Sequence, residues 1–191
     1  MGATVNIQEG NGASVTWTTI TAGRYCTEDA YNPGTTDPCV VPDSGLNYSF
    51  WKHHSLSIGG SYTQITNIRW YTDGAIGWTL GTNGLLGVGL RDSGDNGCPA
   101  ANYQQALGTV GTTGYYLKDN TNGHAYYKGQ TAGPGNAQNY TAGSPLTIDN
   151  TTTYTGTVTA TKSCVSQVII DTDATQGTQA AETFTFKWDE I

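Results

Sequence analysis

The chain has 191 residues, a length typical of one domain. Charged residues make up 12% of it, against about 25% in an ordinary soluble protein, and 26 glycines together with many threonines favour strands joined by turns. The net charge of −7, with only 8 lysines and arginines, disfavours a nucleic-acid or anionic-membrane partner. The sequence contains no run of about 18 apolar residues that would predict a membrane span. It does not open with a basic stretch followed by an apolar one, so we expect no signal peptide.

Alternation of apolar and polar residues predicts strands at the start of the chain. The runs Ala3–Glu9 and Ala13–Ile20 alternate on either side of Gly10–Gly12, which predicts an opening hairpin. Residues 21–45 follow as a loop insertion rich in Pro, Gly and Asp.

Further strands are predicted in the middle of the chain. Four side chains of one parity are expected to face the core: Tyr48, Phe50, Leu56 and Ile58. The parity changes between Ile65 and Ile68, which predicts a β-bulge. Asn83-Gly84 is the preferred pair of a type I′ hairpin turn.

Residues 91–110 are expected to form a second loop insertion, which holds the one convincing helix candidate, Ala100–Leu107. The segment after it reads as a hairpin with tyrosine pairs on both arms: Tyr115, Tyr116, Tyr126 and Tyr127. Neighbours on a strand point to opposite faces, so about half of these tyrosines should face outward, where they suit a protein interface or a sugar platform. Cross-strand tyrosine pairs that shield a sheet edge are the alternative.

The end of the chain predicts three more strands, at residues 153–163, at 164–173 and at the terminus. In the closing strand Phe184, Phe186 and Trp188 alternate with polar residues, so one face is expected to join the core. The last three residues are a second candidate contact with a neighbour: Asp189, Glu190 and Ile191. About nine strands at this spacing predict an all-β fold, an antiparallel β-sandwich or jelly roll with long loops, forming a single domain over residues 1–191.

Four cysteines are candidates for disulfides: Cys26, Cys39, Cys98 and Cys164. Cys26 and Cys39 bracket a loop that a disulfide would staple, which leaves Cys98 and Cys164 as a long-range pair. Four cysteines allow three pairings, and the sequence does not choose among them; four buried thiols are the alternative. There is no CxxC motif and no zinc-finger spacing of histidines, so we expect no zinc site.

Other metal sites are weakly indicated. His53 and His54 are neighbours on a strand and point to opposite faces, so they cannot hold one ion together, and His124 is the remaining histidine. Oxygen-rich stretches offer calcium candidates: Asp92, Asp95, Asp171 and Asp173. Neither stretch has EF-hand spacing, and capping of turns is the commoner use of such aspartates. No cofactor is therefore expected.

The sequence has no signature of catalysis. Neither the G-x-S-x-G nucleophile motif nor the G-x-x-x-x-G-K-[ST] phosphate loop is present. The chain is therefore not expected to be an enzyme.

Four blocks of sequence carry a resemblance, in this order: "ATVNIQE", "NYSFWKHHSLSIGGSYTQITNIRWYTDG", "GSPLTI" and "ETFTFKWDEI". Together they resemble a group of small tailed-phage proteins associated with the virion. The resemblance implies a non-enzymatic β-sandwich component of the particle, such as a capsid decoration or auxiliary head protein. It also implies binding to the major capsid protein or another virion protein in a symmetric or homo-oligomeric assembly, with synthesis in the host cytoplasm and release by lysis. An acidic chain suits the outside of a shell better than packaged DNA. A carbohydrate-binding, lectin-like module at a virion or cell surface is the alternative.

Overall fold

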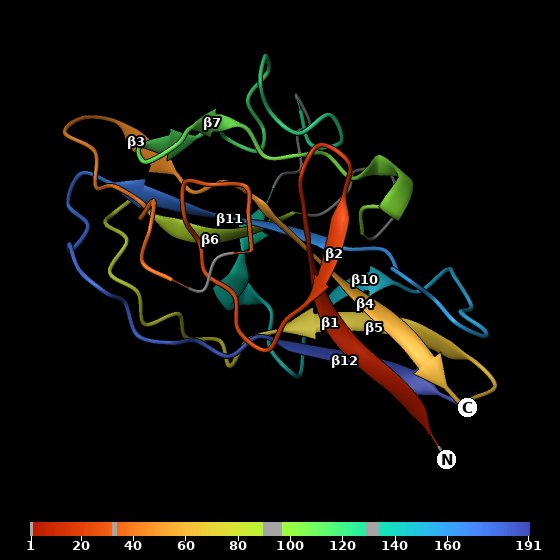
Figure 1. Ribbon diagram of the computed structural model, residues 1–191. Coiled ribbons are helices and arrows are strands. Elements are labelled where there is room, and N and C mark those ends of the chain that lie inside the picture. The colour runs from red at the N-terminus through yellow and green to blue at the C-terminus, as the bar shows by residue number, and fades with distance from the viewer. Residues whose placement is uncertain (1, 32–33, 90–96, 129–133) are drawn as a thin grey trace.

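Strands dominate the computed structural model, which describes residues 2–31, 34–89, 97–128 and 134–191. Strand accounts for 38% of the chain and helix for 3%, which confirms the predicted all-β class. Every strand pair is antiparallel. Figure 1 shows two sheets, and a further segment lies over the larger one. Within the described residues, none of the helices has the length and apolar character needed to cross a membrane.

The larger sheet has seven strands in the described part of the chain, in the order β2-β1-β4-β11-β6-β9, and β3 pairs with one end of β11. Their bounds are β1 (Ala3–Asn11), β2 (Thr16–Thr19), β3 (Leu46–Tyr48), β4 (Lys52–Gly60), β6 (Leu85–Gly89), β9 (Gly135–Asn136) and β11 (Cys164–Asp171). The central strands β4 and β11 carry most of the side chains discussed below.

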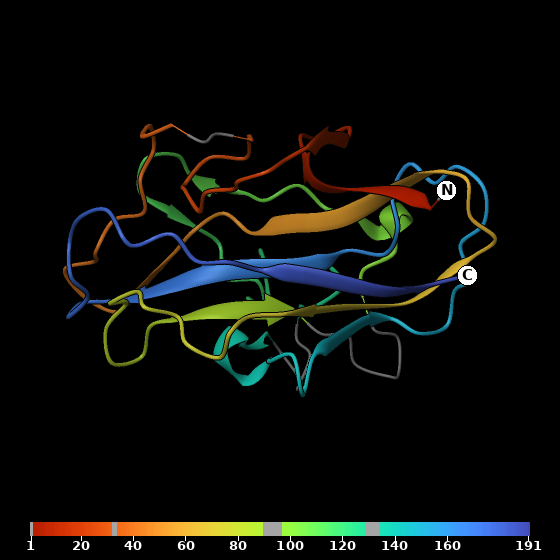
Figure 2. The ribbon, with the colours of Figure 1, turned by 90° about the horizontal axis from the view of Figure 1, so that it is seen from below.

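The smaller sheet has the order β10-β5-β12. Its strands are β5 (Ile65–Tyr71), β10 (Leu146–Asp149) and β12 (Thr185–Glu190). The predicted bulge is confirmed, because the β5–β12 register shifts between Lys187 and Asp189, and Asn67 of β5 has a φ of 52°. Seen from below, the long strands of the two sheets run in nearly the same direction (Figure 2), as in an aligned sandwich.

The main hydrophobic core is built from residues of both sheets. Its buried members from β4 and β5 are Leu56, Ile58, Ile65, Ile68 and Trp70. The terminal aromatics Phe184, Phe186 and Trp188 pack against this core, as predicted, but stay half-buried because β12 is an edge strand.

A second hydrophobic core involves the other faces of β4 and β11, under residues 97–128. That segment contains the 3-10 turn η1 (Ala100–Asn102) and the two-stranded pair β7 (Gly108–Thr109) and β8 (Thr113–Gly114). The buried members of this core are Phe50, Trp51, Cys98, Ala106, Leu117, Tyr126, Tyr127 and Val165. Phe50 was predicted to share a core with Leu56, but it lies in the second core instead. Residues 49–51, between β3 and β4, are not in a strand, so the alternation of side chains does not continue from β3 to β4. A second 3-10 turn, η2 (Ala137–Asn139), lies between β9 and β10.

One buried side chain ties this covering segment to the larger sheet. The Gln167 side chain of β11 donates through Nε2 to the carbonyls of Ser49, at 2.8 Å, and of Tyr115, at 2.7 Å. Its Oε1 accepts the Leu117 N–H at 2.8 Å. All three hydrogen bonds of the amide are thus used to hold the chain around β8.

Two local predictions need correction. The opening hairpin is confirmed, but its strand β1 continues to Asn11 and the turn falls at residues 12–15. The helix predicted over Ala100–Leu107 is only the single 3-10 turn η1, because Tyr103 takes a non-helical ψ of 140° and ends it.

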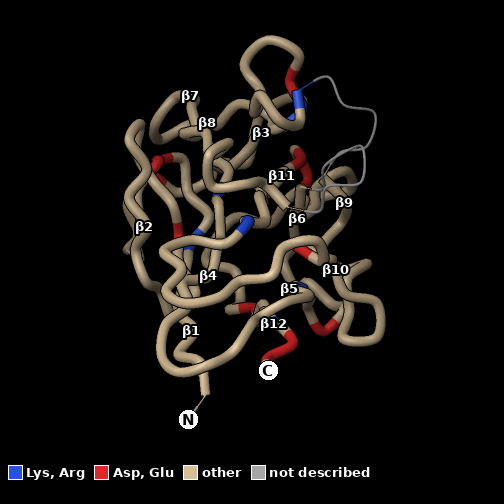
Figure 3. Tube along the Cα trace, turned by 90° about the vertical axis from the view of Figure 1, so that its right-hand side faces the viewer, with Lys and Arg blue, Asp and Glu red and all other residues tan. Residues whose placement is uncertain are grey.

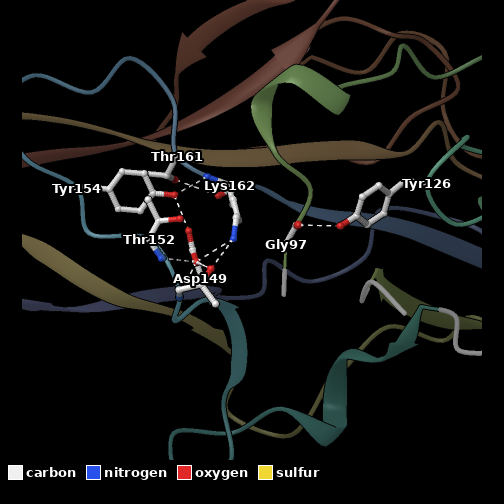
Figure 4. A network of polar contacts seen from close by, with 8 residues as sticks. Gly97, Tyr126, Asp149, Thr152, Tyr154, Thr161 and Lys162 are labelled. Atoms are coloured by element: carbon white, nitrogen blue, oxygen red, sulfur yellow. Dashed lines mark hydrogen bonds and ion pairs between the residues drawn. The ribbon is translucent and has the colours of Figure 1, made fainter. Parts of the chain in front are cut away.

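Residues 153–163 were predicted to be a strand but form only isolated bridges. A polar network organises them instead (Figure 4). The buried Asp149 carboxylate accepts from Thr152 N at 3.1 Å and from Lys162 Nζ at 3.0 Å through Oδ1. Its Oδ2 accepts the Tyr154 hydroxyl at 2.8 Å, and the same hydroxyl oxygen accepts the Lys162 N–H at 3.0 Å. This network fixes the crossing from β10 of the smaller sheet to β11 of the larger one.

Candidate functional site

The second core gathers His53, Cys98 and His124. Each can offer one metal-ligand atom, and these atoms all lie within 4.8 Å of one another. None of the three residues is more than 1% exposed. His53 lies on β4, Cys98 is held beside β11 by a backbone bridge to Ser163, and His124 belongs to a turn of the covering segment. The sequence analysis missed this cluster because no short spacing links the three positions.

Two hydrogen-bond distances describe the surroundings of the His53 ring. Nδ1 lies 3.1 Å from the Ser163 hydroxyl oxygen, which lies 3.2 Å from the Cys98 carbonyl oxygen. In the tautomer in which Nδ1–H donates to Ser163 and Ser163 donates to Cys98, Nε2 carries a lone pair. Nε2 has no hydrogen-bond partner by distance and angle among the described residues, and the Gln104 backbone is near enough to act on the pKa of the ring. Burial, followed by the neighbouring His124 and His54, holds the pKa of His53 well below its usual range, so the ring is neutral at pH 7.

His124 has the opposite tautomer. Its Nδ1 accepts the Tyr126 N–H at 3.1 Å, so Nε2 carries the proton of the neutral ring. That Nε2 also has no partner among the described residues. Burial lowers the pKa of His124 to about 4, which keeps this ring neutral at pH 7 as well.

Aromatic rings enclose the two imidazoles. The His124 ring centroid lies 5.7 Å from that of Trp51 and 5.2 Å from that of Tyr127, and the His53 centroid lies 4.7 Å from that of Tyr103. The simplest interpretation of this cluster is an aromatic core that contains two neutral histidines and binds no ligand. However, buried polar atoms nearly always have a partner, and an unpaired one costs about 1–3 kcal/mol. Two such nitrogens in one enclosed cluster therefore need an explanation.

Two of the calcium candidates have another role in the structure. Asp171 and Asp173 cap the turn Gly81–Gly84: Asp171 Oδ2 accepts Asn83 N at 3.0 Å, and Asp173 Oδ1 accepts Thr82 N at 2.8 Å. The Gly84 N–H donates to the Gly81 carbonyl at 3.1 Å, so Thr82 and Asn83 are the central residues of this turn. A type I′ turn needs a positive φ at both central residues, and neither Thr82 nor Asn83 has one. The predicted type I′ turn at Asn83-Gly84 is therefore wrong.

The other two calcium candidates, Asp92 and Asp95, lie outside the described residues.

None of the four cysteines takes part in a disulfide in the structure. Cys164 packs in the main core and Cys98 in the second core, so the sheet separates the predicted long-range pair. Cys39, by contrast, lies close enough to Cys26 for its electrostatics to be affected: burial, then Cys26, raises the pKa of Cys39 to about 12. A bridge between Cys26 and Cys39 stays a prediction.

The tyrosine-rich segment is not the predicted hairpin. Tyr127 is fully buried and Tyr126 is 9% exposed, with its hydroxyl donating to the Gly97 carbonyl at 3.2 Å (Figure 4). Tyr116 is half-buried and stacks on Tyr48 with 5.0 Å between ring centroids. Only Tyr115, at 41% exposure, presents the outward face that was expected of this group. Tyr126 and Tyr127 are therefore core residues rather than interface residues, because the segment folds over the sheet.

The strands β3 and β7 lie close together at one end of the molecule (Figure 1), and β3 also contacts β8. Five of the six large hydrophobic side chains that are exposed in the described chain lie there: Val40, Leu46, Leu107, Val110 and Tyr115. The Asn47 side chain donates to the Val40 carbonyl at 2.9 Å, and Tyr48 N donates to the Thr113 hydroxyl at 3.0 Å, which join the three segments. We call this set the apolar end. Leu107, Val110 and Tyr115 belong to residues 98–117, a stretch that contains no charged residue. Charged residues occur in other parts of the chain (Figure 3).

The sixth exposed apolar side chain is Ile191, at 70% exposure, in the predicted terminal contact. Its neighbours already have intramolecular partners: Asp189 pairs with Arg69, and Glu190 accepts the Ala3 N–H at 2.7 Å. Both termini lie at the same end of the molecule in Figures 1 and 2. The side-chain carboxylates of Asp189 and Glu190 thus join β12 to β5 and β1, and the predicted contact of Asp189, Glu190 and Ile191 with a neighbour stays a prediction.

A pocket lined by residues of both sheets contains a buried ion pair. Lys52 Nζ lies 2.9 Å from Glu9 Oε1, and both residues are 1% exposed. Burial alone would raise the pKa of Glu9, but the hydrogen bond to His54 and the charge of Lys52 outweigh it and lower the pKa to about 2. The carboxylate is thus a structural anion at neutral pH, not a proton donor.

Comparison with protein-family models, with curated protein sequences and with solved structures finds no match for this chain.

Proposed function

We propose that the chain is a non-enzymatic structural protein of a virus particle that binds a protein of the outer shell through the apolar end. One observation carries the proposal: five exposed apolar side chains gather on adjacent segments, of which residues 98–117 contain no charged residue, while the rest of the described chain exposes one more, Ile191. Exposed apolar groups that collect in one region mark protein contacts more often than scattered ones do.

The attachment of this surface to the sheet supports the proposal. The Tyr115 carbonyl accepts from the buried Gln167, and the Tyr115 N–H donates to the Leu107 carbonyl at 2.9 Å. A surface held in place by the sheet loses little conformational freedom on binding, which lowers the cost of association. The identification of the partner as a shell protein rests on the resemblance of the four sequence blocks to virion-associated phage proteins.

The carbohydrate-binding alternative has less support. Sugar platforms need exposed aromatic rings, and Tyr115 is the one aromatic side chain among the large hydrophobic residues that are exposed in the described chain. The buried positions of Tyr126 and Tyr127 remove two of the four rings on which that alternative depended.

Particle composition tests the proposal. The chain with Leu107→Ser and Val110→Ser should be depleted from purified virions, measured as copies per particle by quantitative mass spectrometry, whereas its melting temperature should stay unchanged because both side chains are already about half exposed. Ile191→Ser is the matched control, since it removes an exposed apolar side chain from another region. The proposal fails if virions lack the wild-type chain, if Leu107→Ser with Val110→Ser leaves the copy number unchanged, or if wild-type virions carry a few copies that bind glycans.

A further inference from the structure

We propose that His53, His124 and Cys98 form a binding site for one zinc or copper ion inside the second core. The proposal goes beyond attachment to a shell and does not depend on it. It rests on the convergence of two imidazole nitrogens and one sulfur within 4.8 Å of one another, in a place that excludes water. Bonds to one tetrahedral ion of about 2.0–2.1 Å to nitrogen and 2.3 Å to sulfur place the donor atoms about 3.3–3.6 Å apart, so a pair separated by 4.8 Å must approach by about 1 Å when an ion binds.

The second argument for a ligand is the state of the ring nitrogens. His53 Nε2 presents a lone pair in the tautomer in which Nδ1–H donates to the Ser163 hydroxyl, 3.1 Å away. Histidine ligands commonly have this arrangement, in which the second ring nitrogen donates to a neighbouring oxygen and so fixes the tautomer. In this tautomer His53 has the arrangement of a metal ligand.

His124 needs one rearrangement before it can bind. Its Nε2 carries the ring proton, which must transfer to Nδ1 before Nε2 can bind an ion, and the hydrogen bond from the Tyr126 N–H to Nδ1 then breaks. Deprotonation of Cys98 also ends the hydrogen bond from its Sγ to the Asn102 carbonyl at 3.4 Å. Against these two hydrogen bonds, an ion makes bonds to three protein atoms. Binding would also remove both unpartnered nitrogens from the core.

The donor set selects the class of metal. One thiolate and two neutral imidazoles suit zinc and copper, whereas calcium and magnesium prefer oxygen ligands. Binding by Cys98 requires its thiol to lose a proton, and the reaction therefore releases a proton to solvent.

A paired set of variants tests the site on the full chain, with thiols kept reduced. Zn²⁺ is added to the metal-free protein, and bound metal is measured by elemental mass spectrometry and by competition with a chromophoric chelator. We expect one equivalent in the wild type, and a loss of affinity of more than about 100-fold in His53→Gln and in Cys98→Ser. The matched controls are His54→Gln, the neighbouring histidine on the other face of β4, and Cys164→Ser, the buried cysteine of the main core. Both should keep wild-type affinity.

Replacing Ser163, which contacts the proposed ligand His53, should change the metal affinity by a smaller amount than replacing a ligand does. Ser163→Ala removes the acceptor that fixes the His53 tautomer and should weaken binding about 10- to 100-fold, whereas a residue with only a packing role would leave affinity unchanged.

Should the ligand variants fail to fold, the wild type alone decides. X-ray absorption of the zinc-loaded protein should show one sulfur and two imidazoles, and Co²⁺ should give the visible bands of a thiolate-bound tetrahedral ion. No binding, a zinc shell of oxygen only, or full binding retained in both ligand variants would overturn the proposal.

Discussion

Replacing Asp149 by Asn tests how the crossing between the two sheets is stabilised. The substitution keeps the side-chain volume but removes the charge that Lys162 Nζ contacts at 3.0 Å, and it places an amide hydrogen donor near groups that already donate. Asp149 is 0% exposed and Lys162 is 15% exposed. A hydrogen bond to a charged group contributes about 1.5–3 kcal/mol, so we expect Asp149→Asn to lower the free energy of unfolding by about 2–3 kcal/mol. Asp149→Ala should lower it by about 3–5 kcal/mol, since it leaves the lysine unpaired.

The pH dependence gives this prediction a sign. Burial alone would raise the pKa of Asp149, but hydrogen bonds from the Thr151 backbone and from Lys162 hold it well below its usual range. The folded-state pKa is thus depressed relative to the unfolded chain, so the stabilisation is present above about pH 4, the ordinary aspartate pKa. It is lost as the pH falls from there through the folded-state pKa. The difference between wild type and Asp149→Asn should therefore shrink below pH 4.

Urea unfolding at several pH values measures both effects, with the midpoint and the slope fitted separately. Asp73→Asn is the control, because Asp73 is an exposed aspartate that accepts one backbone hydrogen bond, from Ala75 N at 2.9 Å. The reasoning is refuted if Asp149→Asn unfolds within about 0.5 kcal/mol of the wild type at pH 7, the range of an ordinary surface substitution. A difference that stays constant from pH 7 to pH 3 would refute the assignment to the carboxylate charge.

The remaining predictions concern the closing strand, the second core and the cysteines. Truncation after Ala181 removes β12 and should abolish cooperative unfolding in a thermal melt. Phe186→Ala, at a half-buried site, should lower the free energy of unfolding in urea by about 2–3 kcal/mol, less than the 3–5 kcal/mol of a fully buried phenylalanine. Tyr127→Ala should cost about 3–5 kcal/mol because Tyr127 is 0% exposed; a loss below 1 kcal/mol in the same assay would contradict its place in the second core. Non-reducing peptide mapping of oxidised protein should find Cys26 bridged to Cys39, a closure that could stabilise by about 3 kcal/mol, and two alkylated thiols would reject that bridge.

Periodicity predicted the strands well where one face of a strand is dry and the other wet. β1 and β12 alternate in sequence and pack one face against the main core, so their type followed the pattern, and the hairpin partner of β1 followed from the turn between the two runs. The first turn was misplaced because Gly10 fits a strand as easily as a turn once Trp17 covers it: a Cβ at Gly10 would lie 2.8 Å from the Trp17 ring.

The second core escaped prediction for a physical reason. β4 is buried on both faces, yet its outer face carries His53 and Ser55, which read as a solvated face in the sequence. Nothing local indicates that a long segment returns to cover these residues. Tyr126 and Tyr127 were consequently placed on the arm of a hairpin with one of the two facing outward, and the partners of His124 were not predicted. Long-range contacts of this kind depend on the path of the chain and not on residue patterns.

The proposed metal site and the apolar end occupy the same stretch of chain, and this suggests that one controls the other. Cys98 and His124 lie near the two ends of the covering segment, and Leu107, Val110 and Tyr115 lie between them. An ion bound to both ends would close this segment into a loop and restrict its movement, which lowers the entropic cost of presenting the apolar end to a partner. We therefore expect Cys98→Ser to reduce copies per virion although it leaves every exposed apolar side chain in place, and we expect Cys164→Ser not to do so. A Cys98→Ser chain that has lost its metal but is incorporated at the wild-type copy number would show that the two features act independently.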